Sequence, residues 1–312
     1  MTNEEMIAQV RKAVTATGDG SGLAAPQDAE EFVDLAVEQT AILSQIHVVT
    51  GIRTTYNLDA ISLAEPVLVA GTEGSAPADD DVVSPSRVRR VLQPKECVAA
   101  FDVSYSFLRQ NIEGERVNES LNRLFAKRFG KDVVMAAFMG DTTLAGTSRT
   151  NKTLRVVDGF VKRALSDASV HEYVIPASPS YSTVVFPGML SQLPKDYRDE
   201  REDLGLFVSA DVYDAYAAEI GSRATALGDM ILAGAWGKAL SYMGITLYPV
   251  FGLASDRVVL TLRQNLAVGF GREMTPGVDF DNRARLMKVT ITADVDASYV
   301  QGDALVLGVG EM

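Results

Sequence analysis

The sequence has few of the side chains that carry out most enzyme chemistry. Among 312 residues there are one cysteine, two histidines and one tryptophan. Because Cys97 is alone, no disulfide can form within the chain. A nucleophilic cysteine needs a nearby base, and only His47 and His171 exist, so we interpret Cys97 as an inert buried thiol. Both histidines are interpreted as satisfied, partly buried residues, and Trp236 as a packing residue or interface anchor.

Long apolar runs and basic charge are also lacking. No stretch of about eighteen apolar residues occurs, so we expect no transmembrane helix and no membrane partner. Lys and Arg total 29 against 41 Asp and Glu, which gives a net charge of -12. An acidic surface repels phosphates, which argues against a protein that grips DNA and suits the wall of a container. A need for solubility would explain the same charge.

The motifs of common catalytic and metal sites are absent. The sequence has no HExxH, CxxC or EF-hand spacing, no GxxxxGK[ST] loop and no GxSxG turn. We therefore predict no catalytic residue, no metal and no cofactor. The clustered acidic residues are interpreted as solvated or as surface ion pairs: Asp79, Asp80 and Asp81 in a loop, Asp279 and Asp281 beside Arg283 and Arg285, and Asp294 and Asp296 on the polar face of a strand.

The first half of the chain places a long punctuated stretch between two helical patterns. Residues 28–46 predict a helix. Residues 54–94 are rich in Gly, Pro and Ser, and the segments 66–70 and 88–92 within them predict the two sides of a long hairpin. A strand is predicted over 96–108 and the longest helix over 111–139. Its core-facing side is predicted from apolar residues at intervals of four, Val117, Leu121, Phe125, Phe129 and Val133, with Leu124 widening the apolar stripe.

The second half of the chain is richer in strand patterns. A helix is predicted over 154–166, and another over 210–222 with Ser209 as its N-cap. The most informative block is 257–300, where apolar and polar residues alternate with a period of two on both sides of a charged link at 272–285. In its second alternation one side is apolar: Met287, Val289, Ile291, Ala293 and Val295. Because helices and strands are interleaved without a βαβ pattern, the chain is predicted to be α+β.

This order of elements resembles the Hong Kong 97-like capsid fold of tailed-bacteriophage major capsid proteins. The resemblance covers almost the whole chain and is carried by the layout and by the closing strands with their step at residues 265–269, Asn-Leu-Ala-Val-Gly. It implies five segments: an N-terminal arm over 1–50, an extended β-hairpin loop with its strands over 51–110, a peripheral domain over 111–179 with its spine helix at 111–139, an axial domain over 180–255, and closing strands of the peripheral domain over 256–312.

The resemblance also implies a function and a set of partners. Copies of the chain would self-assemble into hexamers and pentamers that form an icosahedral head shell around double-stranded DNA, in the virion after assembly in the host cytoplasm. About fifty residues precede the loop, which implies a separate scaffolding protein or none. A portal and a cement or decoration protein are further implied partners, and the packaged DNA would be met by non-specific proximity. Residues 54–94 contain no lysine, so a covalent crosslink from the loop tip is not expected.

The charges of the loop lead to one hypothesis about contacts between subunits. The acidic residues near its tip, Asp79, Asp80 and Asp81, are opposite in sign to three residues on its returning side, Arg87, Arg89 and Arg90. If the tip of one subunit lies over a neighbour, these charges can pair between chains. The alternative is a solvated tip whose acids only prevent sticking.

Two other functions remain open on the sequence alone. An encapsulin-like nanocompartment shell shares the fold and would enclose a cargo enzyme, so the enclosed material distinguishes it from a phage head. An acidic α+β enzyme would be a small monodisperse species with activity on a substrate.

Overall fold

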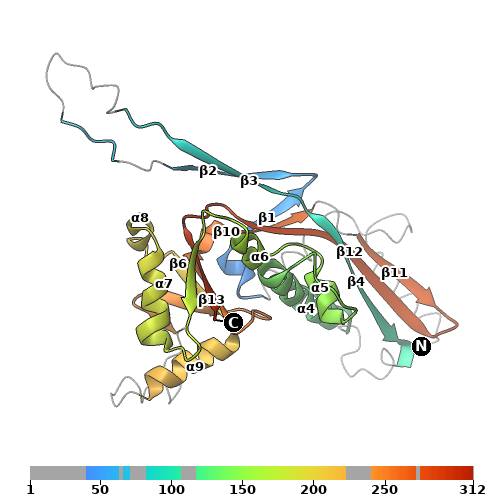
Figure 1. Ribbon diagram of the computed structural model, residues 1–312. Coiled ribbons are helices and arrows are strands. Elements are labelled where there is room, and N and C mark those ends of the chain that lie inside the picture. The colour runs from blue at the N-terminus through green and yellow to red at the C-terminus, as the bar shows by residue number, and fades with distance from the viewer. Residues whose placement is uncertain are drawn as a thin grey trace.

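The computed structural model describes residues 40–62, 66–70, 82–106, 117–222, 240–271 and 275–311. The side chains of 117–123, 275–278 and 280 are outside this description. The molecule consists of two β-sheets with helices packed on them, and a two-stranded hairpin that projects away from this body (Figure 1). Within the described ranges, no helix is long and apolar enough to span a membrane.

The first sheet has five strands and is built around one long strand, β12. Its order is β1-β10-β12-β11, and β4 pairs with the other side of β12. β1 runs parallel to β10, and the other pairs are antiparallel. The strands are β1 (His47–Ile52), β4 (Lys95–Ser104), β10 (Leu266–Gly271), β11 (Thr275–Asp281) and β12 (Leu286–Tyr299). The apolar side predicted for the alternation that forms β12 is confirmed, because Met287, Ile291, Ala293 and Val295 are buried.

The longest helix, α4 (Val117–Met139), packs against this sheet. The ring of Phe125 stacks on that of Phe101 in β4, with 3.4 Å between the ring centroids. Phe129 and Val133 are buried in the core cluster that includes Ile291 and Ala293 of β12. The side chain of Leu121 and residues 111–116 of the predicted helix lie outside the described part of the chain.

The second sheet has six strands in the order β5-β13-β9-β6-β8-β7. These strands are β5 (His171–Ile175), β6 (Leu204–Val208), β7 (Ser241–Tyr242), β8 (Ile245–Pro249), β9 (Arg257–Leu262) and β13 (Leu305–Gly310). The helices beside this sheet are the π-helix η4 (Tyr181–Val185), α7 (Phe186–Gln192), the short α8 (Lys195–Arg198) and α9 (Ala210–Gly221). The predicted N-cap is confirmed, because the Ser209 hydroxyl accepts a hydrogen bond of 3.2 Å from the backbone N–H of Val212.

A cluster of three aromatic rings lies between the two sheets. Phe138 of α4 meets Phe160 of α6 (Phe160–Leu165) edge to face at 5.0 Å and Phe207 of β6 at 5.5 Å. All three rings are fully buried. The body therefore has a continuous core that runs from the first sheet, through α4 and α6, to the second sheet.

Three segments of the second half of the chain differ from the sequence-based predictions. The closing residues 256–312 are divided between the two sheets, because β9 and β13 belong to the second sheet whereas β10, β11 and β12 belong to the first. The link at 272–285 contains strand β11, which pairs with β12 from Thr275 to Asp281. The helix predicted over 154–166 is two helices, α5 (Arg149–Leu154) and α6, with Gly159 between them.

The break before α6 has a packing cause. A Cβ at Gly159 would lie 2.7 Å from the carbonyl oxygen of Ala137 and 2.7 Å from the backbone nitrogen of Gly140, where α4 ends. Glycine is thus required where the chain passes against the end of α4. Of the helix predicted over 28–46, the described residues 40–46 contain only the 3-10 turn η1 (Leu43–Gln45).

Candidate functional site: the hairpin and its anchor

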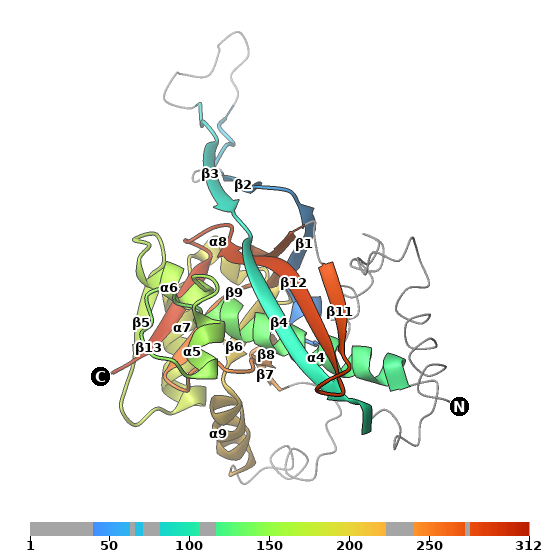
Figure 2. The ribbon, with the colours of Figure 1, turned by 90° about the vertical axis from the view of Figure 1, so that its right-hand side faces the viewer.

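The hairpin consists of β2 (Tyr56–Ser62) and β3 (Ser86–Leu92), paired antiparallel from Tyr56 opposite Leu92 to Ser62 opposite Ser86. Both views show that it projects well beyond the two sheets (Figures 1 and 2). The predicted partner of 88–92 was wrong, since β3 pairs with β2 and residues 66–70 form no strand. The register is set at the base, where Leu58 and Leu92 are both buried against the body.

The hairpin, together with the described residues of the loop that joins its two strands, exposes apolar side chains that the body of the protein does not cover. Leu68 is 97% exposed, and Val67, Val69, Val82 and Ile61 are also exposed. A two-stranded hairpin alone is at best marginally stable in water, and exposed apolar groups of this kind often mark a contact with another protein. The hairpin is therefore the first candidate for a surface that contacts another molecule.

Two of the arginines named from the sequence have a partner inside the hairpin. Arg87 and Arg89 both pair with Asp59 of β2, at 2.5 and 2.8 Å. Their hydrogen bonds, first that from Arg89, lower the pKa of the Asp59 carboxyl below its usual range. One carboxylate faces two guanidinium groups, and both arginine side chains are at least half exposed, so this face keeps one surplus positive charge. Residues 79–81 lie outside the described part of the chain, and their pairing with a neighbour stays a prediction.

The base of the hairpin rests on the body through a small apolar cluster. Ile52, Leu58 and Leu92 are buried against Ala267 of β10. A Cβ at Gly269 would lie 2.6 Å from Cδ1 of Ile52 and 3.1 Å from Cδ1 of Leu92. Glycine at this position of β10 therefore allows the chain on either side of the hairpin to cross the first sheet in close contact.

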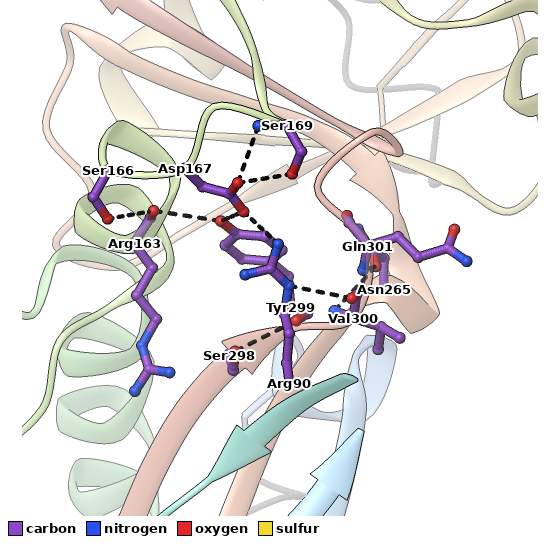
Figure 3. A network of polar contacts seen from close by, with 10 residues as sticks. All are labelled: Arg90, Arg163, Ser166, Asp167, Ser169, Asn265, Ser298, Tyr299, Val300 and Gln301. Atoms are coloured by element: carbon purple, nitrogen blue, oxygen red, sulfur yellow. Dashed lines mark hydrogen bonds and ion pairs between the residues drawn. The ribbon is translucent and has the colours of Figure 1, made fainter. Parts of the chain in front are cut away.

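The third arginine, Arg90, reaches from the hairpin to the body (Figure 3). Its guanidinium forms an ion pair with Asp167, which follows α6, and lies over the ring of Tyr299 at 4.3 Å from the centroid. Its Nε donates a hydrogen bond of 3.3 Å to the carbonyl oxygen of Val300, and the Tyr299 hydroxyl donates one of 2.8 Å to the Asp167 carboxylate. We call Arg90, Asp167 and Tyr299 the anchor.

A second carboxylate fixes the chain just beyond the hairpin. Asp296 of β12 accepts hydrogen bonds of 2.7 Å from the backbone N–H of Gln93 and from Nη2 of Arg163 in α6. The sequence-based interpretation of Asp296 as a surface residue was wrong, because its side chain is only 3% exposed. Burial raises the pKa of Asp296 against the opposing effects of Arg163 and the Gln93 N–H. β12 is covered on both faces at this end, so its alternation no longer separates core from solvent.

The described residues around the anchor offer no free charge to a ligand. A groove of about 450 Å³ lies beside it, with Arg90, Arg163, Ser166, Asp167 and Ser298 in its lining. Both arginines already pair with carboxylates, so the groove is close to neutral. Among the described residues, no group of three or more His, Cys, Asp or Glu is placed to hold a metal ion.

Cys97, the only thiol, lies in β4 and is half-buried. Burial, together with the nearby Asp294, raises its pKa to about 11, and its Sγ donates to the carbonyl oxygen of Ala293 at 2.9 Å. A thiol with such a pKa is almost fully protonated at neutral pH and is a poor nucleophile.

Asp167 is expected to stabilise the fold only while its carboxylate is ionised. Burial acts to raise its pKa, but hydrogen bonds from Ser169, Tyr299 and Arg90 outweigh this and lower it. Since the unfolded chain takes up the proton first, the stabilisation is lost as pH falls below about 4. Asp167→Asn should lower the free energy of unfolding by about 1–3 kcal/mol at neutral pH, and by much less in acid. Urea unfolding of both proteins across this pH range measures the difference, and a constant difference would contradict the assignment.

Comparison with known proteins places these features in a wider context. No model of a protein family matches the chain. A curated protein, "Putative prophage capsid protein YqbE" of Bacillus subtilis (strain 168), is 24% identical over 98% of this chain and 97% of its own. Among solved structures, a chain of the satellite phage P4 procapsid with its size determination (Sid) protein matches with a TM-score of 0.70, at 14% identity over 99% of this chain and 98% of its own.

The chain has the Hong Kong 97-like capsid fold. The likeness extends to a virus-like particle from Pyrococcus furiosus, with a TM-score of 0.52 at 10% identity over 89% of this chain and 96% of that one. It also extends to the capsid of a native GTA particle, with a TM-score of 0.54 at 12% identity over 88% and 89% of the two chains. The expectation of this fold from the order of sequence elements is confirmed.

Proposed function

We propose that this chain is the major capsid protein of a tailed phage or prophage, and that copies of it form the icosahedral head shell around double-stranded DNA. The observation that carries the proposal is the match over nearly the full length of both chains to a phage procapsid subunit. The relative described as a prophage capsid protein supports it, since it too is matched along almost its whole length. The role is structural, and the inert Cys97 and the charge-paired groove are consistent with it.

The partners follow from this role. The first partner is the chain itself, in the hexamers and pentamers of a closed shell. A separate scaffolding protein, a portal and a cement or decoration protein are the further partners that such a shell uses. Packaged DNA would be met by proximity rather than by tight binding, because the net charge is -12. The location is the capsid of the virion, after assembly in the host cytoplasm.

Electron microscopy of the purified chain, together with sedimentation, tests the proposal. Ring-shaped capsomers or closed shells are expected, with the purified protein alone or with a candidate scaffolding protein. Only monomers and dimers under all assembly conditions would count against it. Shells that retain a cargo enzyme instead of DNA would favour an encapsulin-like compartment, and a small active species would favour an enzyme.

The acidic residues Asp79, Asp80 and Asp81 are proposed to pair with arginines of a neighbouring subunit. Arg87 and Arg89 are suited to this, because they share one carboxylate and remain half exposed. Each exposed pair contributes only about 0–1 kcal/mol, but the contact would repeat once per subunit. Replacing all three acids with Asn should lower the temperature of particle disassembly at low salt, and the difference from the parent should vanish at high salt, where exposed pairs are screened.

A matched control separates a local contact from a change in total charge. Asp211 and Asp214 on α9 and Asp279 on β11 are exposed, and both elements lie away from the projecting end of the hairpin in Figures 1 and 2, so replacing these three residues with Asn removes the same charge elsewhere. The control should behave like the parent at both salt concentrations. If the loop variant also matches the parent at both, the loop acids are solvated and form no contact between subunits.

A further inference from the structure

We infer that Arg90 and Asp167 are positioning residues, which hold the hairpin in one direction before it meets a neighbouring subunit. This rests on the proposed function, in which such a neighbour exists. It concerns a step that precedes contact, so it can be tested on subunits that have not assembled.

The connection between hairpin and body is short on both sides. Residues 53–55 join β1 to β2, and residues 93–94 join β3 to β4. Neither joint belongs to a strand, so each is free of the ladder hydrogen bonds that would hold the hairpin in line with the first sheet. The hydrogen bond from the Gln93 N–H to Asp296 fixes the position of the second joint, but a single bond does not set the angle of the hairpin, which therefore depends also on what its base touches beyond these joints.

Two kinds of contact lie at the base, and they differ in directionality. The cluster of Ile52, Leu58 and Leu92 against Ala267 holds the base down, but apolar burial is non-directional. The guanidinium of Arg90 is a planar group with donors in fixed directions, and it also stacks on an aromatic face. Its contacts can therefore define the angle between the hairpin and the body, which the apolar cluster alone cannot.

The partners of Arg90 come from separate parts of the body, as Figure 3 shows. Asp167 follows α6, while Tyr299 and Val300 lie at the end of β12. Tyr299 is fully buried, and Asp167 is held by two hydrogen bonds from Ser169, at 3.0 Å from the backbone N–H and 2.8 Å from the hydroxyl. Both partners thus have contacts within the body besides those with Arg90, since Tyr299 also donates to Asp167, and the guanidinium lies between groups that the body holds in place.

The other arginines of β3 provide an internal comparison. Arg87 and Arg89 pair with Asp59, which is itself part of the hairpin. These pairs stiffen the hairpin but cannot fix it relative to the body. Among the three arginines, only Arg90 forms an ion pair that crosses from the hairpin to the body.

A hairpin held in its docking direction loses less conformational freedom when it binds, which favours association. Removing the Arg90 side chain should therefore leave the subunit folded but lower its rate of assembly. It should also allow wrongly angled contacts, and so widen the distribution of particle sizes. Arg90→Lys keeps the charge but loses the planar fork, and should recover only part of the effect.

The test is a distance measurement between the hairpin and the body by pulsed electron spin resonance. Spin labels are attached to Ile61→Cys on β2 and Val174→Cys on β5, two exposed positions, in a Cys97→Ser background. Soluble unassembled subunits are measured with wild-type Arg90, with Arg90→Ala, with Arg90→Lys and with Arg87→Ala as the matched control. Particle yield and size of the unlabelled variants are then measured by electron microscopy.

The expected result is a narrow distance distribution for the parent and for Arg87→Ala, a clearly broader one for Arg90→Ala, and an intermediate one for Arg90→Lys. Particle yield should fall several-fold for Arg90→Ala. An unchanged distribution in folded Arg90→Ala would overturn the positioning role, whatever happens to assembly. If the parent forms no particles at all, the proposed function fails, whereas the distances still decide whether Arg90 directs the hairpin.

Discussion

A chain in which Phe129 is replaced by alanine is expected to lose about 3–5 kcal/mol of its free energy of unfolding. Phe129 lies on α4 and is 8% exposed, within the core cluster that joins the helix to β12. Removing the ring leaves a cavity between the helix and the first sheet, and the sheet cannot close over it because β12 is held by strands on both sides. Urea unfolding of soluble subunits measures the loss, and insoluble protein is the outcome if the loss exceeds the total stability.

The control for Phe129 lies on the same helix. The prediction that Leu124 widens the core-facing stripe was wrong, because its side chain is 60% exposed. Leu124→Ala therefore removes an apolar side chain without opening a cavity. Its free energy of unfolding should stay within about 0.5 kcal/mol of the parent. If Phe129→Ala unfolds at the same urea concentration as Leu124→Ala, the core-facing side of α4 has been assigned wrongly.

Asn265→Ala is expected to destabilise the chain by about 2–4 kcal/mol, since buried polar groups left without partners each cost about 1–3 kcal/mol. Asn265 is buried, and its amide nitrogen donates to Thr261 Oγ1 and to the carbonyl oxygen of Gln301, both at 2.9 Å. Its side-chain oxygen accepts from the backbone N–H of Gln301 at 2.8 Å and from that of Val300 at 3.2 Å. One side chain thus ties the turn between β9 and β10 to the turn after β12.

Gln264, the preceding residue, provides the comparison because it is exposed. Gln264→Ala should leave the urea midpoint unchanged, while Asn265→Ala should lower it. The carbonyl oxygen of Val300 also accepts a hydrogen bond from Arg90. Asn265→Ala should therefore also weaken the attachment of the hairpin to the body, which would be measured as faster amide hydrogen exchange in β3. Equal midpoints for the two variants would show that the hydrogen bonds of Asn265 contribute nothing to stability.

Much of the fold could be predicted from the local sequence pattern, where one face of an element meets the core and the other meets solvent. This holds for α9 with its Ser209 cap and for the alternation through Ile291 and Val295. Strand β11 was missed because Pro276 and Gly277 normally indicate a turn. Here they lie opposite Ile291 and Thr290 in an outer strand of the sheet, where proline is tolerated.

The site could be predicted only in part, because its contacts are distant in sequence. The sequence suggested that Arg87, Arg89 and Arg90 belong to a projecting loop. The alternation of a strand puts Arg90 on the opposite face from the other two, but it does not tell which face meets the body. The partner of Arg90, Asp167, is 77 residues away, and it comes near only because β12 brings Tyr299 beside the end of α6. The burial of Asp296 was missed for the same reason, since α6 and the residues after β3 cover the face of β12 that the alternation assigned to solvent.

The way in which the hairpin joins the first sheet also determines how a pulling force would spread through the subunit. β3 passes into β4 through Gln93 and Pro94 alone, and β4 then runs away from the hairpin (Figure 2). β4 is paired with β12 along its whole length, from Lys95 opposite Val295 to Ser104 opposite Leu286. Tension applied to the hairpin therefore acts along β4 and shears this ladder, so that its hydrogen bonds share the load instead of opening one at a time. A hairpin bound by a neighbouring subunit would therefore transmit force to the body, and the force that it withstands would depend on the pairing of β4 with β12.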